Sequence, residues 1–447
     1  MTIDRATRPS PHTRRGLLMA AVGTPIGLAL SACAPGTTGT GSAPPTGPLK
    51  AGTKLVVVSP GGDRVPLYEQ YAKTFQDQNA GVTVEIVSTA DANRVEKVLT
   101  MLTSGTQADL FTFGATQTPT WVERGLLRPL DDLVRRDKYD LSDFFEPAVE
   151  QYRWKGKLYA LSRGFGHQDI YYNTSLWDTT GLKRPTYDWK STSWTVEEFL
   201  DATTRLTRGS GGGDGTKPVW GYVQRSNTWE PWVWNFGGEI LNKDGTACTL
   251  DQPQAVEGLQ FLQDLIHKHR VMAPPSAKVN PRNAMGTGEV VMGLDNKMDP
   301  YRGLATTHRL QFDAAPLPRK VRRMTTGGGV GWHMASAVKD ANAAWALHKW
   351  LAGSDLQQAE CAAGEATPTR KSVTRSTCFA DRSLPPKGID AVIQSAEFVH
   401  PDPQAVGWPS ISDEINFDAL WTGEKTARQI VTEFVPRVNA LLKQHAR

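Results

Sequence analysis

Residues 54–59 (KLVVVS), 82–87 (VTVEIV) and 108–113 (ADLFTF) are three short segments rich in β-branched and aromatic residues. Such segments predict buried β-strands. The stretches between them carry apolar residues at helical spacing, which predicts one helix around 68–75 and another around 95–102. Strand, helix, strand, helix and strand in this order require parallel pairing of the strands. The sequence therefore predicts an α/β fold.

Small and polar residues follow the first and third of these strands. Pro60-Gly61-Gly62-Asp63 comes after the first, and Gly114-Ala115-Thr116 comes after the third. In parallel α/β sheets, ligands bind beyond the carboxyl ends of the strands. We therefore expect Gly62, Asp63 and Thr116 to line the wall of a ligand cleft.

Two later stretches carry local folding signals. Residues 154–159 (WKGKLY) predict a tight hairpin, because Lys-Gly separates two short extended segments. Thr195 followed three residues later by Glu198 is typical of a capping box that starts a helix. Trp194, just before the cap, is placed to pack on Phe199 as a hydrophobic staple.

The first 52 residues indicate export. Arg14-Arg15 precede a short apolar run that ends in Leu30-Ser31-Ala32-Cys33. This pattern predicts a Tat-type lipoprotein signal peptide with a lipobox over residues 1–33, with lipid on the Cys33 thiol; the alternative is an ordinary signal peptide with an incidental cysteine. Residues 34–52 are mostly Gly, Ser, Thr, Pro and Ala and predict a flexible tether. We expect a protein that is lipid-anchored at the extracellular face of the cell membrane.

Charge and cysteine content exclude several classes of partner. Removing residues 1–32 takes away four Arg and one Asp and lowers the net charge from +4 to +1. The mature chain is near neutral and has one basic cluster, at 319–323, so its charge does not indicate nucleic-acid binding. We expect that cluster to be a solvated loop. No metal-type spacing is present, so we expect no metal and no cofactor. Cys361 and Cys378 could form a disulfide, and the sequence leaves this open.

A series of short motifs runs along the chain after residue 100. In order they are SGTQADL (104–110), WVERGLLRPL (121–130), GKLYAL (156–161), YYNTSLW (171–177), SWTVEEF (193–199), NFGGE (235–239), GTGEVVM (286–292) and ATPTR (366–370). Together, behind a lipobox, they resemble the family 1 extracellular solute-binding proteins of ABC importers, the maltose-binding-protein group. The resemblance covers nearly the whole mature chain.

This resemblance implies a two-lobed periplasmic-binding-protein-like fold with a hinge and an interlobe ligand cleft. The crossings between lobes are expected near 161–165, 315–319 and 367–371. The N-terminal lobe would then comprise 53–162 and 318–368, and the C-terminal lobe 163–317 and 369–447. A monomer that captures a carbohydrate and delivers it to the membrane permease of an ABC importer is the expected function.

Aromatic residues are the first candidates for ligand contacts. Trp229, Trp232 and Trp234 crowd three indoles into six residues, and an indole face stacks well on a sugar ring. We expect one or two of the three to line the cleft and the rest to pack in the core. By resemblance to the family, Trp408 is a second stacking candidate, and Trp332 follows a glycine-rich ligand-side segment that contains Gly328 and Gly329.

Polar candidates lie near the predicted crossings. The family's frequent aromatic residue after the Gly-x-x-Val-Met strand is absent, and Asp295 and Asn296 stand there instead as partners for sugar hydroxyls. This departure argues against a simple maltodextrin ligand. Gln168 and Arg370 complete the set of expected ligand-binding residues.

Two other classes of function remain open on the sequence alone. A secreted carbohydrate-active enzyme would need a pair of cleft carboxylates, for which Asp63 with Asp295, or Glu230 with Asp295, are candidates. The chain has no HExxH, no G-x-S-x-G and no P-loop, so we expect a binding protein without catalytic residues. A binder of a non-sugar solute and a lipoprotein that acts as a sensor or adhesion module are further alternatives.

Overall fold

The computed structural model describes residues 49–209 and 218–446. The predicted signal peptide, Cys33 and most of the predicted tether lie outside these residues. Among the described residues, no helix is both long enough and apolar enough to cross a membrane.

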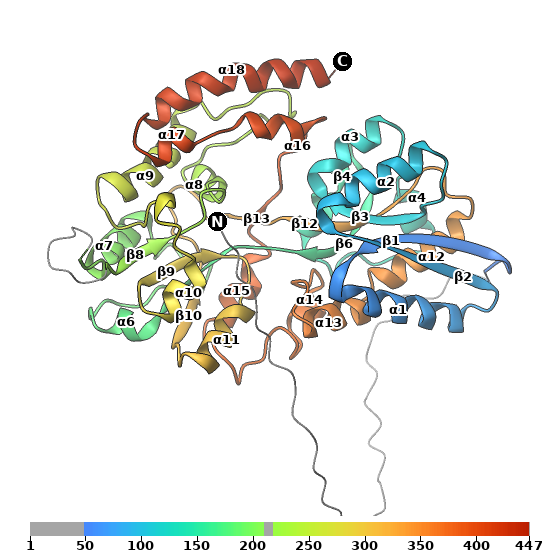
Figure 1. The fold of residues 1–447 in the computed structure, drawn as a ribbon, viewed down its shortest axis with the longest axis horizontal. Helices are drawn as coiled ribbons and strands as arrows, with labels where there is room; N and C mark the ends of the chain where they lie inside the picture. The colour runs from blue at the N-terminus through green and yellow to red at the C-terminus, as the bar shows by residue number, and fades with distance from the viewer. Residues whose placement is uncertain (1–48, 210–217, 447) are drawn as a thin grey trace, which may run out of the picture. The chain divides into compact units, whose positions relative to one another are not determined.

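The first sheet contains the three strands predicted at the start of the chain. Its order is β2 (Val82–Thr89), β1 (Thr53–Pro60), β3 (Leu110–Gly114), β12 (Gly329–Met334) and β6 (Ala160–Phe165). β1 pairs in parallel with β2 and β3, which confirms the prediction, whereas β12 runs antiparallel to both of its neighbours. Helices α1 (Val65–Gln78) and α12 (Ala341–Leu351) contact each other and β1 (Figure 1).

The second sheet has the order β10 (Phe312–Ala315), β7 (Asp169–Asn173), β9 (Val290–Asp295) and β8 (Trp220–Val223). β7 is antiparallel to both neighbours, and β8 is parallel to β9. Helix α8 (Glu230–Asn235) packs on α9 (Pro253–His267), which in turn contacts the C-terminal helix α18 (Ala427–His445) (Figure 1).

Shorter elements connect and cover the two sheets. The remaining helices are α2 (Arg94–Thr103), α3 (Thr118–Glu123), α4 (Asp131–Arg136), α5 (Glu146–Glu150), α6 (Thr174–Asp178), α7 (Val196–Leu206), α10 (Pro281–Gly286), α11 (Asp299–Thr307), α13 (Ser354–Ala362), α14 (Lys371–Thr374), α15 (Ile389–Ser395), α16 (Trp408–Ile411) and α17 (Asp418–Trp421). Single 3-10 turns are η1 (Gly62–Arg64), η2 (Asp91–Asn93), η3 (Ala115–Gln117), η4 (Pro275–Ala277) and η5 (Ser412–Glu414). Two small ribbons pair β4 (Arg153–Trp154) with β5 (Lys157–Leu158), and β11 (Thr325–Thr326) with β13 (Val399–His400).

The local folding signals in the sequence produce the predicted structures. β4 and β5 form the hairpin, with positive φ at Lys155 and Gly156 in its turn. The Thr195 side chain accepts from the Glu198 backbone N–H, and the Glu198 carboxylate accepts from the Thr195 N–H, which completes the capping box of α7. The Trp194 and Phe199 rings meet edge to face with centroids 6.0 Å apart, as a hydrophobic staple requires.

The connection between β10 and β12 packs differently from the prediction. Arg319 pairs with Thr195, and β11 pairs with β13, so residues 319–326 contact elements of the second sheet's side. The chain joins the first sheet only at β12, which is later than the crossing predicted near 315–319. The prediction that residues 319–323 form a solvated loop is wrong for Arg323. Its side chain is buried and donates to five backbone carbonyls.

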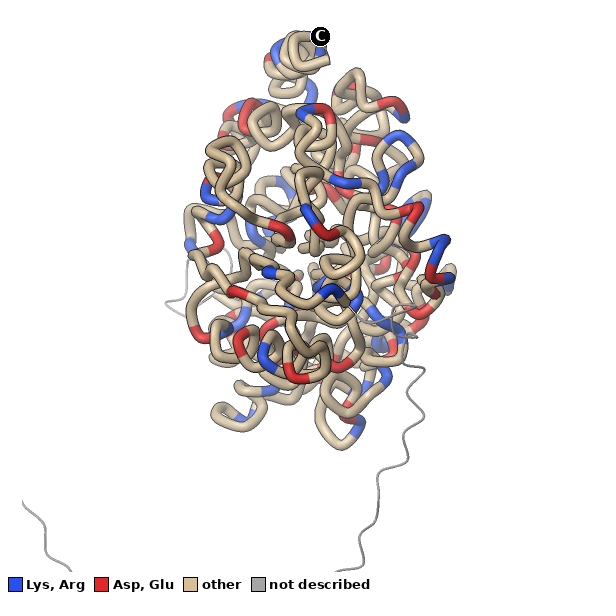
Figure 2. Tube along the Cα trace, turned by 90° about the vertical axis from the view of Figure 1, so that its right-hand side faces the viewer, with Lys and Arg blue, Asp and Glu red and all other residues tan. Residues whose placement is uncertain are grey.

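The described part of the chain mixes residues of both charges and carries its cysteines as free thiols. Figure 2 shows basic and acidic residues interspersed along the chain. Cys361 and Cys378 are free thiols in the structure and lie in one apolar cluster, where burial and the neighbouring Cys378 raise the pKa of Cys361.

Candidate ligand-binding cleft

A polar pocket of about 170 Å³ lies where segments of the two sheets meet. Strand β9 ends in it with Asp295, the segment between β6 and β7 supplies Gly166 and Gln168, and the turn before β12 supplies Gly328. Its walls are Gly166, Gln168, Arg225, Asn227, Thr228, Glu230, Leu294, Asp295, Asn296, Thr326 and Gly328. The lining is mostly amide, hydroxyl and charged groups, which suits a ligand rich in hydrogen-bonding groups.

A second pocket of about 190 Å³ adjoins the first. Both include Gly166, Asn296 and Gly328 in their walls. The second also reaches Arg163 and Lys297. The two pockets therefore share a wall, and together they are called the cleft below.

Close backbone contact shapes the boundary between these pockets. The Gly166 N–H donates to the Gly328 carbonyl at 2.9 Å. A Cβ atom added at Gly327 would lie 2.2 Å from the Gly166 carbonyl oxygen, so only glycine fits there. The Thr325 hydroxyl donates to the Gln168 carbonyl at 2.7 Å and fixes the segment that carries Gln168.

Asp295 is buried in the pocket wall and tied to fixed partners. The Arg282 guanidinium donates to its two carboxylate oxygens at 2.6 and 2.7 Å. The Asn296 N–H and the Tyr301 hydroxyl donate to the same carboxylate at 2.7 and 3.2 Å. These four donors hold the Asp295 carboxylate in a fixed position in the pocket wall.

Two side chains of the pocket keep buried oxygens without a partner. The Oε2 atom of Glu230 and the Oε1 atom of Gln168 are inaccessible to solvent and accept no hydrogen bond within the described residues. Leaving such an acceptor unpaired costs about 1–3 kcal/mol. Both residues line the pocket, so this unpaired polarity lies within its wall.

A second carboxyl group lies close to Glu230. Burial raises the pKa of Glu230 to about 8, with a smaller contribution from the negative charge of Asp402 in the segment between β13 and α16. Burial also raises the pKa of Asp402 to about 7, against a lowering effect of His400. Asp402 likewise raises the pKa of the buried Tyr152, which precedes β4 on the side of the first sheet.

The structure brings together four of the predicted ligand-binding residues. Gln168, Asp295, Asn296 and Gly328 all line the same pocket. The other predicted residues of the first sheet's side lie elsewhere: Gly62 and Asp63 are in η1 and exposed, Thr116 is in η3, and Gly329 begins β12.

Arg370 is engaged within the protein. It is buried and donates to the Tyr139 hydroxyl at 2.6 Å and to the Ala352 carbonyl at 2.9 Å, and it pairs with Asp143 at 3.1 Å. Its guanidinium also lies over the Phe144 ring, 4.1 Å from the centroid. These contacts assign Arg370 to packing against the 139–144 segment, away from the two pockets.

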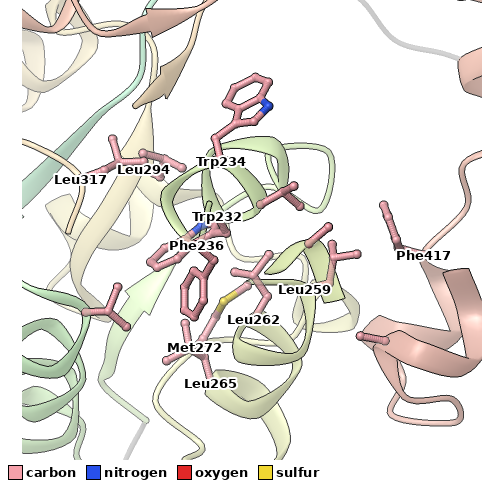
Figure 3. Close-up of a cluster of buried hydrophobic side chains, with 14 of the residues drawn as sticks. Trp232, Trp234, Phe236, Leu259, Leu262, Leu265, Met272, Leu294, Leu317 and Phe417 are labelled. Carbon is pink, nitrogen blue, oxygen red and sulfur yellow. The ribbon is translucent and has the colours of Figure 1, made fainter. Parts of the chain in front are cut away.

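The tryptophans proposed as stacking platforms lie in apolar clusters instead of the pocket walls. Trp232, Trp234 and Trp408 are 0%, 1% and 5% exposed and belong to the core of the second sheet's side, and Trp229 packs against that core. Figure 3 shows Trp232 beside Phe236 in this cluster, while the Trp234 ring points away from it. Trp234 stacks on His400 with centroids 4.2 Å apart. Trp332 is fully buried in the core of the first sheet.

Several pocket residues were absent from the predicted ligand set. Arg225, Asn227 and Thr228 lie in the loop between β8 and α8, and Thr326 and Glu230 complete the polar wall. Glu230 could have been predicted from the sequence, because it is a carboxylate among three tryptophans. A charged group in such an apolar segment is costly to bury and is therefore a candidate for function. Asp402 carried no such local signal.

Comparisons with known proteins agree with this geometry. A model of the bacterial extracellular solute-binding protein family matches residues 70–384. The chain belongs to this family. A putative binding protein of Brucella abortus (strain 2308) is 22% identical over 389 residues, which are 85% of this chain and 90% of that protein. An arabinooligosaccharide-binding protein of Halalkalibacterium halodurans is 24% identical over 228 residues, which are 50% of this chain and 48% of that protein.

Solved structures share the fold of this family member. The sugar-binding protein MalE from Xanthomonas citri superposes with a TM-score of 0.76 at 17% identity, over 88% of this chain and 98% of that one. The substrate-binding protein Lmo0181 from Listeria monocytogenes, in complex with cycloalternan, gives 0.69 at 20% identity, over 88% and 99%. The α/β, two-lobed fold of the maltose-binding-protein group is thus the fold of this chain.

Proposed function

We propose that this protein is the extracellular solute-binding lipoprotein of an ABC importer, which captures a mono- or oligosaccharide in the cleft and delivers it to a membrane permease. The observation that carries the proposal is the polar cleft whose walls come from segments of both sheets. Amide and hydroxyl side chains there match the hydroxyl groups of a sugar. The arabinooligosaccharide-binding relative and the sugar-bound solved structures support the same class of ligand.

The cleft differs from an aromatic sugar site. None of the eleven residues that line the first pocket is aromatic, and Phe379 is the second pocket's one aromatic besides Phe165. Affinity would therefore come mainly from hydrogen bonds rather than from stacking. This agrees with the departure from the maltodextrin pattern seen at Asp295 and Asn296.

A thermal-shift screen of the full chain against mono- and oligosaccharides tests the proposal, because a ligand that binds only the folded state raises its melting temperature. Isothermal titration then gives the Kd of each hit. Asn296→Ala should weaken binding about tenfold by removing a cleft hydrogen-bonding group. Asn342→Ala, at an exposed position of α12, is the matched control and should bind normally. If no saccharide raises the melting temperature and a non-sugar solute does, the carbohydrate assignment is wrong.

Delivery to a permease needs a cellular test. Deleting the gene should abolish uptake of the radiolabelled saccharide found in the screen, and the wild-type gene should restore it. Unchanged uptake in the deletion strain would contradict a role in import.

A further inference from the structure

Two basic side chains line the cleft without an acidic partner. Arg225 lines the first pocket and Lys297 lines the second, and both residues are exposed. Within the part of the chain that the structure describes, neither side chain forms an ion pair or a hydrogen bond. Their positive charges are therefore open to a ligand that enters the cleft.

The acidic groups of the first pocket do not offset this charge. The Asp295 carboxylate accepts from the Arg282 guanidinium through both of its oxygens, at 2.6 and 2.7 Å, so that pair is neutral as a unit. Burial raises the pKa of Glu230 to about 8, so this carboxyl group holds a proton at neutral pH. Arg225 is left as the unbalanced charge of the first pocket.

In the second pocket, every charged residue except Lys297 has a partner of opposite sign. The pairs are Arg163 with Glu360 at 2.7 Å, Asp299 with Arg302 at 3.6 Å, and Glu365 with Arg64 at 3.6 Å. Each pocket thus carries one uncompensated positive charge.

The loop that carries Arg225 is fixed to the core. The Arg225 carbonyl accepts from the Thr228 N–H at 3.1 Å and from the Thr228 hydroxyl at 2.7 Å. The buried Gln224 side chain donates to the Thr228 carbonyl at 3.1 Å. Its own amide oxygen accepts from the Tyr222 hydroxyl at 2.8 Å and from the Trp232 indole N–H at 2.7 Å. Because this backbone is already ordered, a ligand that binds Arg225 has only its side chain to immobilise.

We propose that the ligand of the cleft is an acidic saccharide, a sugar that carries a carboxylate or phosphate group, and that Arg225 binds this group. This inference rests on the proposed function, because it names the subclass of carbohydrate that the same cleft takes. A guanidinium presents two parallel N–H donors that match two oxygens of either group. Lys297 strengthens the positive field, which attracts an anion into a concave surface. Asn227 and Asn296, exposed amides in the first pocket, are placed for the sugar hydroxyls.

Matched pairs of ligands test the proposal on the full chain. The carboxylate pairs are galacturonic acid with galactose and glucuronic acid with glucose, and the phosphate pair is glucose 6-phosphate with glucose. The methyl ester of galacturonic acid keeps the substituent without its charge, and inorganic phosphate supplies the anion without a sugar. Kd is measured by isothermal titration at pH 7 in about 0.05 M and about 0.5 M NaCl, because salt screens exposed charges.

The variants separate charge from geometry. Arg225→Gln removes the charge, Arg225→Lys keeps the charge without the paired donors, and Lys297→Gln removes the second cation. Arg124→Gln is the matched control, since Arg124 is exposed at the end of α3 and lines neither pocket. Melting curves will show that all variants fold.

We expect at least one acidic sugar to bind about tenfold or more tightly than its neutral partner, and less tightly at high salt. Arg225→Gln should weaken its binding about ten- to a hundredfold, the loss typical of a hydrogen bond to a charged group, and Arg225→Lys should lose less. Lys297→Gln should weaken it about two- to fivefold, as an exposed charge does. Arg124→Gln should change nothing. The more tightly bound acid, uronic acid or sugar phosphate, identifies the group that Arg225 recognises.

The outcomes separate this inference from the proposed function. If neutral sugars or the methyl ester bind as tightly as the acids, or if acid binding survives Arg225→Gln, the acidic assignment is overturned and the carbohydrate function stands. If inorganic phosphate binds and no saccharide does, or if nothing binds, the proposed function fails together with the inference.

Discussion

The Arg163 Nε atom lies 2.7 Å from the Glu360 carboxylate, and the two side chains are 5% and 1% exposed. Arg163 belongs to β6 and Glu360 to α13, so this buried ion pair joins the edge of the first sheet to a helix far along the chain. The Tyr68 hydroxyl of α1 donates to the same carboxylate at 2.5 Å. Three elements thus meet in one charged cluster beside the second pocket, whose wall includes Arg163.

Breaking this ion pair should destabilise the fold. Glu360→Met leaves the Arg163 charge buried without a counterion, and we expect a loss of about 3–5 kcal/mol in the free energy of unfolding, measured with urea. The double variant Arg163→Met/Glu360→Met removes both charges and should recover most of that loss. A single variant as stable as the wild type would show that solvent reaches Arg163.

The buried tryptophans should act on stability rather than on affinity. Trp232→Ala and Trp408→Ala each remove a core indole and should lower the free energy of unfolding by about 3–5 kcal/mol. Binding to the folded fraction should be unchanged, because neither ring lines the described pockets. Weak binding with near-normal melting in Trp408→Ala would instead support a stacking platform.

Stability should fall as the pH rises from about 6.5 to 8. The folded pKa of Glu230, about 8, is above its ordinary value of 4.5, so the folded state holds a proton that the unfolded state has lost in this range. Stability that is fully present below about pH 4.5 is therefore lost progressively until about pH 8, by at most about 1.4 kcal/mol per pH unit for each such group. Asp402, with a folded pKa of about 7, acts in the same direction.

Melting curves of Glu230→Gln check this sign. The variant should lose stability less steeply above pH 6.5 and should exceed the wild type at pH 8.5. Burial lowers the pKa of His333 to about 3 and of His348 to about 4, so their contribution is lost only as the pH falls below 6.5. Equal slopes for variant and wild type above pH 6.5 would contradict a protonated Glu230.

Lipid attachment at Cys33 remains a prediction of the sequence. Mass spectrometry of the membrane-extracted protein should find Cys33 as the first residue, with a diacylglycerol group on its thiol. Cys33→Ala should release the protein from the membrane fraction, whereas Cys248→Ala, at a buried thiol, should leave it there. An unmodified N-terminus would favour an ordinary signal peptide.

The sequence by itself determined the elements whose causes are local. The apolar, β-branched segment 54–59 forms a strand that is buried on both faces of the sheet. The capping box of Thr195 and Glu198 involves only residues in the first turn of α7, so it can be read from the local sequence. Parallel pairing of β1 with β2 and β3 also follows from chain order, because the helices between these strands allow no tight reversal. Of the candidate pocket, Gln168 could be predicted from its place beside a crossing, and Asp295 and Asn296 from the end of a strand. Gly328 followed from the family's glycine-rich segment.

Only the tertiary structure decided which indoles and carboxyls face the cleft. Trp232 packs on Phe261 of α9, and Trp234 stacks on His400. Because these partners are distant in sequence, residues 229–234 alone do not show which of the indoles is buried. The charge of Asp402 acts on Glu230 although the two residues are far apart in sequence, because electrostatic coupling depends on distance in space. Local periodicity fixes secondary structure, whereas burial and charge coupling depend on contacts between distant segments, and those contacts form the site.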